Sequence, residues 1–182
     1  MMQSSALVDL DLDDPALPSY LPSASKLIIS LHMKHFDRKR IEQLLKLPGA
    51  FYARKIVFEA MSFEEILQTQ AMIKNSDQSR VIFNVTGRYA AFQRPLYRFF
   101  SSFAVYLYYS ESTYPGQLSF AQFHQISGTG IRKDSSIYGI IGGAQVSTSY
   151  SLEAYNQYFR DRETDAHYLP IPAKDCQEAI RI

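Results

Sequence analysis

The side chains best suited to chemistry in this sequence are four histidines, a single cysteine and a few clustered acids. His32 and His35 lie three residues apart in or beside an extended segment, so their side chains point to opposite faces and cannot share a metal ion. Cys176 lies near the C-terminus, without a histidine close to it in the sequence. We therefore predict that the protein has no metal site and no cofactor.

A partial glycine motif and the acid clusters are the other candidates for a catalytic site. Gly128 and Gly130 are spaced as in a dinucleotide-binding loop, but Lys133 stands where the third glycine is needed. Arg132 and Lys133 beside the glycine amides could hold a phosphate, although an ordinary loop is the simpler interpretation. The acids at residues 64–65 and 161–165 lie in hydrophilic surroundings, whereas acid–base catalysis needs a cleft that separates two pKa values. We therefore predict no catalytic residue and no enzyme activity.

Two stretches rich in lysine and arginine give the stronger chemical signal. Residues 34–55 contain seven bases and two acids, and residues 80–133 contain six bases and only Glu111 as an acid. Basic stretches with interleaved aromatic residues can bind phosphate on lipid headgroups or on a nucleocapsid, while solvated helix faces are the alternative. The first stretch is the predicted membrane- or nucleocapsid-binding face and consists of Lys34, Arg38, Lys39, Arg40, Lys46, Arg54 and Lys55.

Length and composition set the limits of the molecule. The 182 residues are 46% hydrophobic, which suffices for one well-buried domain. A single cysteine excludes an internal disulfide, and neither a signal peptide nor an apolar run of about 18 residues is apparent, so we expect a cytosolic protein. The first 25 residues carry four acids and no lysine or arginine, so an acidic arm precedes a mildly basic body. This arm either remains solvated or folds back on a basic face.

Periodicity predicts the elements that would position these residues. Three prolines within residues 1–25 favour a flexible arm. Residues 26–34 alternate in hydrophobicity as a half-buried strand does, and Asp37 is a good N-cap for a helix through residue 47. Helices are predicted at residues 50–61, from Ser62 to about residue 74, at residues 119–126 and at residues 152–160; strands are predicted at residues 81–85, 97–109 and 137–146.

Because the helices gather early and the strands late, we predict an α+β fold: an antiparallel sheet with the early helices packed on it. The predicted organisation is a disordered acidic arm (1–25), one compact globular domain (26–165) and a loosely ordered C-terminal tail (166–182).

The order of several short landmarks resembles that of rhabdovirus matrix proteins. After the strand at 26–34 and the basic helix at 37–47 come the segment at 49–58, the turn at 87–89, Arg94-Pro95, the segment at 110–112 and the strand at 137–141. The resemblance implies a viral structural protein that self-associates and bridges the inner membrane leaflet and the nucleocapsid during budding. It places the protein in the virion and host cytoplasm, without sequence-specific nucleic-acid binding. Pro18, Ser19 and Tyr20 would then form a degenerate late motif that recruits host budding proteins.

Two other classes of function are compatible with the sequence. The first is a cytosolic adaptor or effector that binds a host protein through an aromatic sheet face, as the 13 tyrosines and 12 phenylalanines allow. The second is a small hydrolase or transferase whose site is assembled from distant residues. A deep polar pocket that holds His124 or an isolated carboxylate would favour this second class.

Overall fold

A computed structural model describes residues 6–20, 25–112, 117–128 and 130–181. Contacts between Cα atoms divide the chain into two compact units. The first unit comprises the chain as far as Asn84 together with Phe100–Val105. The second comprises Val85–Phe99 and the chain from Tyr106 onward.

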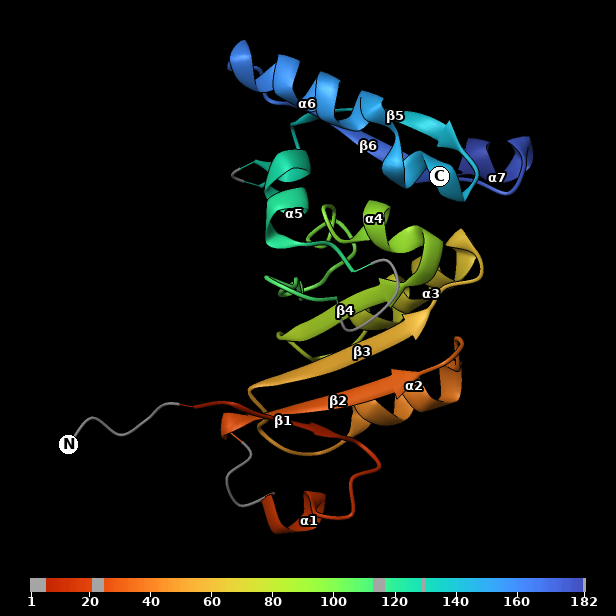
Figure 1. The fold of residues 1–182 in the computed structure, drawn as a ribbon. Helices are drawn as coiled ribbons and strands as arrows, with labels where there is room; N and C mark the ends of the chain where they lie inside the picture. Colours follow the sequence, from red (N-terminus) through yellow and green to blue (C-terminus); the bar gives the residue numbers. More distant parts are fainter. Residues whose placement is uncertain (1–5, 21–24, 113–116, 129, 182) are drawn as a thin grey trace, which may run out of the picture. The chain divides into compact units, whose positions relative to one another are not determined.

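A four-stranded sheet forms the centre of the first unit, and its strands lie side by side in chain order (Figure 1). The strands are β1 (Val8–Asp11), β2 (Leu27–Met33), β3 (Ala53–Glu59) and β4 (Val81–Thr86). The last two residues of β4 belong to the second unit. The helices between them are α1 (Leu17–Tyr20), α2 (Arg38–Lys46) and α3 (Phe63–Lys74). β2 runs parallel to both β1 and β3. Parallel neighbours need a crossover connection, which α2 supplies between β2 and β3.

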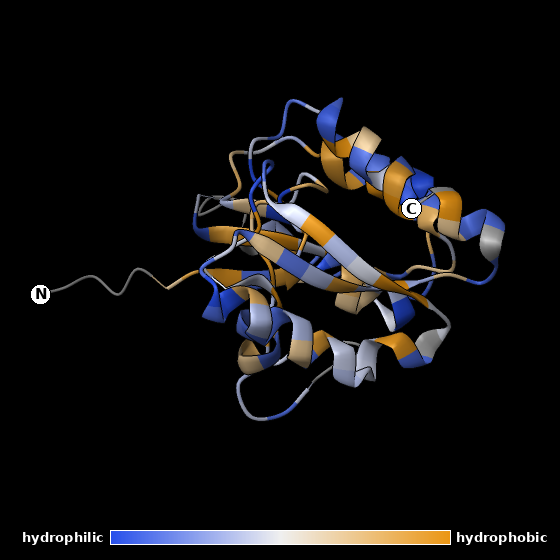
Figure 2. Ribbon diagram, turned by 90° about the horizontal axis from the view of Figure 1, so that it is seen from above, coloured by the Kyte–Doolittle hydropathy of each residue, from blue (hydrophilic) through white to orange (hydrophobic). Residues whose placement is uncertain are grey.

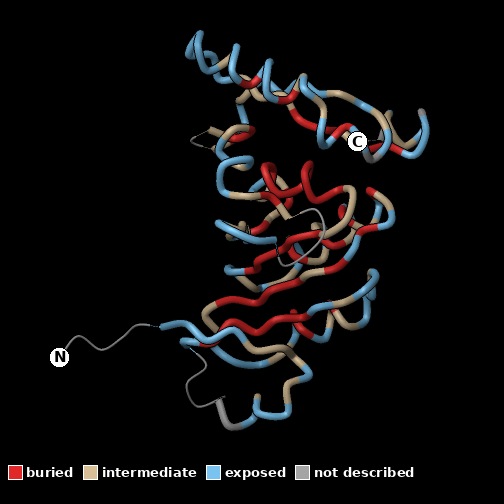
Figure 3. Tube along the Cα trace, viewed as in Figure 1, coloured by how far each residue is buried: buried red, intermediate tan, exposed pale blue. Residues whose placement is uncertain are grey.

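The main apolar core of this unit lies on the face of the sheet that α2 covers. Ile29 and Leu31 of β2 and Ile56 of β3 are at most 1% exposed. α2 contributes Ile41 and Leu44, both fully buried, and it contacts β2, β3 and α3. Burying each such side chain stabilises the fold by about 1.5–3 kcal/mol. Buried residues accordingly run along most of β2 and β3 (Figure 3).

The starts of the helices follow the sequence prediction. The Asp37 carboxylate accepts a hydrogen bond from the backbone N–H of Arg40, and the Ser62 hydroxyl accepts one from the N–H of Glu65. Each side chain satisfies one backbone donor that the first turn leaves without an intrahelical partner. The predicted N-caps of α2 and α3 are therefore confirmed. Hydrophilic and hydrophobic residues lie next to each other along the helices, as half-buried helices require (Figure 2).

The second unit contains a βαβ arrangement. A two-stranded parallel sheet pairs β5 (Ser136–Gly142) with β6 (Ala166–Pro172) along their whole lengths, and α6 (Tyr150–Asp161) packs on β6. The buried amide of Asn156 joins the helix to the strand, because its nitrogen donates to the carbonyl of Tyr168 and its oxygen accepts from the N–H of Tyr168. The elements of this unit are η2 (Gly87–Tyr89), α4 (Ala90–Gln93), α5 (Phe120–Ser127), β5 (Ser136–Gly142), η3 (Ala144–Thr148), α6 (Tyr150–Asp161), β6 (Ala166–Pro172) and α7 (Cys176–Arg181).

The prediction of an antiparallel sheet is wrong, since the fold is α/β with parallel strands. Residues 53–59 form β3 and not part of a helix, because parallel strands are buried on both faces and read as apolar runs without clear alternation. Residues 97–109 do not form the predicted long strand, although Tyr108 makes an isolated bridge to Ser119. Aromatic residues favour strands in general, yet here they fill turns and irregular segments.

The described parts of the predicted arm and tail are more regular than expected. Residues 8–11 form β1, and the N–H of Leu12 donates to the carbonyl of Ser30. Three of the acids that suggested a solvated arm, Asp9, Asp11 and Asp13, are instead bound to the body of the first unit, and Asp13 lies 2.6 Å from Arg40. In the predicted tail, β6 and α7 are regular elements. The physical reason is that strand pairing and ion pairs offset the entropy of ordering these segments.

Candidate active site on the parallel sheet

A buried lysine occupies the middle of the sheet in the first unit. The side chain of Lys55 in β3 is only 10% exposed, and its Nζ lies 2.7 Å from the Asp9 carboxylate of β1. Asp9 also accepts a hydrogen bond from the hydroxyl of Ser30 in β2. Burial of a charge is costly unless it is paired and hydrogen-bonded. Asp9 therefore holds the lysine amine in place across three strands.

A histidine and a second carboxylate lie at the carboxyl ends of the neighbouring strands. His32 Nδ1 of β2 lies 3.0 Å from Asp11 Oδ2, the last residue of β1. Burial raises the pKa of Asp11, but hydrogen bonds from the Asp13 N–H and from the imidazole outweigh it, so the pKa is lowered overall. An ionised Asp11 accepts a hydrogen bond from the imidazole and so fixes its orientation.

Strand register brings these two pairs together. Asp11, Ser30 and Lys55 are aligned across β1, β2 and β3. Side chains two residues apart on a strand share one face, so Asp9 and Asp11 face the same way, as do Ser30 and His32. The hydrogen bonds show that all of them point to the same side of the sheet. A lysine, a histidine, a hydroxyl and two carboxylates therefore gather on one face.

This combination is suited to covalent chemistry on a carbonyl group. A lysine amine in partly apolar surroundings can form a Schiff base with a ketone or an aldehyde. An adjacent histidine can accept and return a proton at the neighbouring carbon. In parallel sheets, ligands bind beyond the carboxyl ends of the strands, which is where His32 and Asp11 lie.

The predicted basic face is not a single surface. Arg54 is 5% exposed and donates to the carbonyls of Leu44, Leu47 and Gly49. Its burial lowers the pKa of the guanidinium, so this side chain joins the end of α2 to β3 and is not presented to a partner.

The other predicted bases are dispersed. Lys55 belongs to the buried cluster, while Arg38 forms an ion pair within α2 with Glu42, which Lys46 also approaches. Lys34 and Lys39 are exposed. The seven bases predicted from the sequence therefore include both buried and solvated side chains. Arg54 and Lys55 face opposite sides of the sheet, because alternate residues of one strand point opposite ways.

The second basic stretch also contains a buried arginine. Arg94, in the second unit, is 3% exposed and donates to the carbonyls of Val85 and Tyr106. Burial lowers the pKa of its guanidinium to about 10. Arg94 thus stabilises turns in its own unit, where few water molecules can compete for those carbonyls.

The remaining candidates from the sequence have ordinary positions. Gly128 and Gly130 have φ values of +55° and +119°, and they end α5. Arg132 binds Asp165, whose pKa is lowered by hydrogen bonds from Ser135 and Arg132. His124 lines a polar pocket near these residues. Among the described residues, no group of three or more histidines, cysteines, aspartates or glutamates could hold a metal ion.

Of the predicted late motif, Pro18 is exposed and lies in the short helix α1, which also includes Ser19 and Tyr20. A helical turn differs from the extended conformation in which proline motifs are bound.

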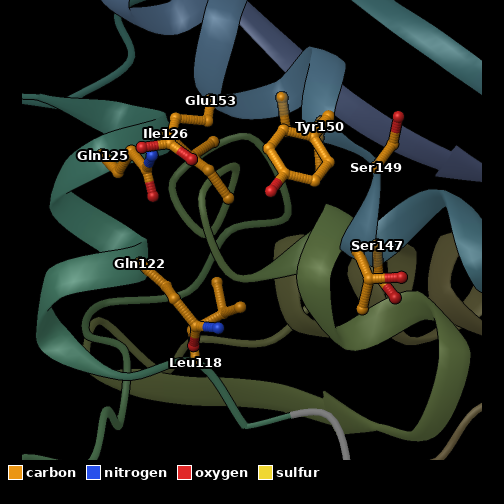
Figure 4. A pocket seen from close by; sticks show the side chains of 10 residues that line it. Leu118, Gln122, Gln125, Ile126, Ser147, Ser149, Tyr150 and Glu153 are labelled. Carbon is orange, nitrogen blue, oxygen red and sulfur yellow. The ribbon is translucent and has the colours of Figure 1, made fainter.

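A hydroxyl-rich pocket of about 190 Å³ lies in the second unit. Gln122, Gln125 and Ile126 of α5 face Ser147 of η3 and the start of α6 across it (Figure 4). On the α6 side, the Ser149 hydroxyl caps the helix, and Tyr150 and Glu153 complete the wall. The pocket is smaller than the roughly 300 Å³ at the lower end of drug-sized sites. It fits a small polar molecule.

Sequence reasoning missed the residues of the sheet cluster. His32 was considered only as a metal ligand, Asp9 and Asp11 only as part of an acidic arm, and Lys55 only as a surface base. One signal was available: Ser30 and His32 are polar residues two apart within the otherwise apolar run at residues 27–33, and Asp9 and Asp11 repeat that spacing. Their pairing could not be found, because it depends on strand order and register.

Comparisons with known proteins give a fold likeness only. No protein-family model matches the chain, and no curated protein matches it in sequence. Among solved structures, the chain is similar to the 3-dehydroquinate dehydratase from Aquifex aeolicus VF5, with a TM-score of 0.53 and 20% identity over 64% of this chain. It is also similar to the dehydroquinate dehydratase and shikimate dehydrogenase from S. pombe AroM, with a TM-score of 0.51 and 17% identity over 96% of this chain. The chain spans 56% and 35% of the lengths of these two proteins.

These findings correct the functional prediction. The resemblance to rhabdovirus matrix proteins, with its viral structural role, late motif and location in virions, is wrong, because the solved structures that share this fold are named as dehydroquinate dehydratases. The same two neighbours, which are named as enzymes, contradict the prediction that the protein is not an enzyme, and they give no support to the alternative of a host-protein adaptor. The described helices include none long and apolar enough to cross a bilayer. Self-association remains a prediction.

Proposed function

We propose that the first unit carries out a dehydratase reaction on a hydroxylated ketone through a Schiff base on Lys55. The single observation that carries this proposal is the buried Lys55–Asp9 pair with Ser30 and the His32–Asp11 pair on the same sheet face. Two structural neighbours named as dehydroquinate dehydratases support the choice of reaction and suggest 3-dehydroquinate as the substrate.

Imine formation is the first step. Lys55 must lose a proton to become nucleophilic, and Asp9, which accepts its hydrogen bond, is placed to take that proton. The neutral amine adds to the ketone carbon, and one of its protons passes to the carbonyl oxygen. Asp9 then returns the proton that it took from Lys55, so that this oxygen leaves as water. The product is a protonated imine, whose positive charge draws electrons from the adjacent carbon.

Elimination follows from that charge. His32 removes a proton from the carbon next to the imine, and the electron pair of the C–H bond moves toward nitrogen to form an enamine. The enamine then expels the hydroxyl group on the following carbon, which leaves as water with a proton from the His32 imidazolium. Water hydrolyses the resulting imine and frees Lys55. One molecule of water is lost overall.

Borohydride trapping tests the proposal. The protein is incubated with 3-dehydroquinate and sodium borohydride, and peptides are mapped by mass spectrometry. We expect one reduced adduct, on Lys55, and none in Lys55→Met. The matched control is Lys74→Met, since Lys74 is an exposed lysine in the same unit, and this variant should form the adduct normally. An unmodified protein, or adducts spread over exposed lysines, would exclude the Schiff-base reaction.

A second candidate function concerns the second unit. Its hydroxyl-lined pocket offers Ser147, Ser149 and Gln122 to a small polar ligand. The S. pombe neighbour, which is also named as a shikimate dehydrogenase, is similar to 96% of this chain, so the match extends into this unit. We propose that the pocket binds the hydroxyl groups of a small ligand, and shikimate is the first compound to test.

A further inference from the structure

A buried asparagine in β4 has no hydrogen-bond partner among the residues that the structure describes. Asn84 is 1% exposed, and neither its amide nitrogen nor its amide oxygen is hydrogen-bonded within the part of the chain that the structure describes. Most buried polar groups in folded proteins are paired, so an unpaired amide calls for an explanation. A bound ligand that supplies the missing partners is one such explanation.

The position of Asn84 relates it to the Lys55 cluster. Ile28, Ala53 and Ile82 form one apolar cluster, so these residues of β2, β3 and β4 lie on the same side of the sheet. Two residues further along each strand, on that same side, stand Ser30, Lys55 and Asn84. Ser30 and Lys55 are aligned in register. The hydrogen bond from the Arg54 N–H to the Arg80 carbonyl sets Ile82 opposite Lys55 and Asn84 opposite Val57, which is itself aligned with His32. Asn84 therefore lies on the same face as Lys55, on the neighbouring strand and two residues further toward its carboxyl end.

The chemistry of the amide indicates what it recognises. An asparagine offers two donors and an acceptor, and a hydroxyl group is both a donor and an acceptor. A carboxylate at this position would compete with Asp9 for the lysine, whereas a neutral amide does not. We propose that Asn84 is a specificity-determining residue that binds a hydroxyl group of the substrate beside the carbonyl carbon that Lys55 attacks. This inference rests on the proposed Schiff-base function and adds the substrate group that the site selects.

The test compares two ketones in the unsubstituted protein and in Asn84→Leu, a replacement of similar size without polar atoms. One ketone is 3-dehydroquinate, and the other is cyclohexanone, which has no hydroxyl group. For 3-dehydroquinate we expect KM to rise about tenfold, the equivalent of one lost hydrogen bond. Borohydride trapping of cyclohexanone on Lys55 should not change. The melting temperature should rise, because the leucine removes an unpaired buried amide.

The controls separate a binding role from a structural one. Asn84→Thr keeps a hydroxyl group on the strand and should recover part of the loss with 3-dehydroquinate. An unchanged KM in Asn84→Leu would overturn the inference alone. A lower melting temperature with equal losses for both ketones would also overturn it, since that pattern indicates a structural amide. Absence of any adduct in the unsubstituted protein would overturn both the proposed function and this inference.

Discussion

At the scale of single residues, the depressed pKa of Asp11 gives the fold a specific dependence on pH. Hydrogen bonds from the Asp13 N–H and from His32 lower the pKa below the value of 3.8 that an isolated aspartate has, although burial acts in the opposite direction. At a pH between the lower pKa of Asp11 in the folded protein and its higher pKa in the unfolded chain, the unfolded chain binds a proton at Asp11 and the folded protein does not. Asp11 therefore stabilises the folded state fully above about pH 4, and this contribution is lost as the pH falls through the folded-state pKa.

The corresponding prediction concerns Asp11→Asn. At pH 6 the variant should be less stable than the unsubstituted protein, because it lacks the charge that His32 contacts. As the pH falls below about 4 the difference should shrink, because the folded protein then also begins to take up a proton at Asp11. Urea unfolding at several pH values measures the difference. A gap that stays constant from pH 6 to pH 3 would contradict the assignment.

Residues of this kind explain what the sequence could and could not predict about the site. Lys55 follows Arg54 directly, and in the sequence both read as members of one basic stretch. In the fold, Arg54 binds the carbonyls at the end of α2, while Lys55 binds Asp9 on the other side of the sheet. Alternation along a strand separates them. From the sequence alone, residues 50–61 are expected to form a helix. The separation of Arg54 and Lys55 onto opposite faces of a strand therefore could not be predicted.

At the scale of elements, local signals were reliable and long-range pairing was not. The caps at Asp37 and Ser62 and the elements at residues 119–126 and 152–160 depend on interactions within a few residues, so the sequence contains them. The parallel pairing of β1, β2 and β3 depends on residues more than 15 positions apart. The periodicity of one strand carries no information about the direction of its neighbour.

The cap of α2 provides a prediction at this scale. Asp37→Ala removes the acceptor for the Arg40 N–H and should lower the free energy of unfolding by about 1 kcal/mol. Asp37→Ser keeps an acceptor oxygen at the same position and should retain most of the stability. Chemical denaturation of the three proteins, followed by circular dichroism, provides the measurement. Equal losses in both variants would show that the charge matters and the cap does not.

At the scale of the whole molecule, the two candidate sites are built by different units. Lys55, Asp9 and His32 belong to the first unit, whereas Ser147, Ser149 and Tyr150 belong to the second. No described residue is shared between the two sets. Substitutions at sites without shared partners usually have independent effects, so each site should respond only to changes in its own residues.

Two single variants test that independence. The Tyr150 side chain lines the hydroxyl-rich pocket and is 90% exposed, so Tyr150→Ala should weaken shikimate binding by several-fold, about 1 kcal/mol, without loss of folding. Its Lys55 adduct with 3-dehydroquinate should form at the normal rate. Lys55→Met should abolish the adduct and leave shikimate binding, measured by calorimetry, unchanged. If either variant altered both readouts, the two sites would have to be coupled, and the second unit would influence the chemistry of the first.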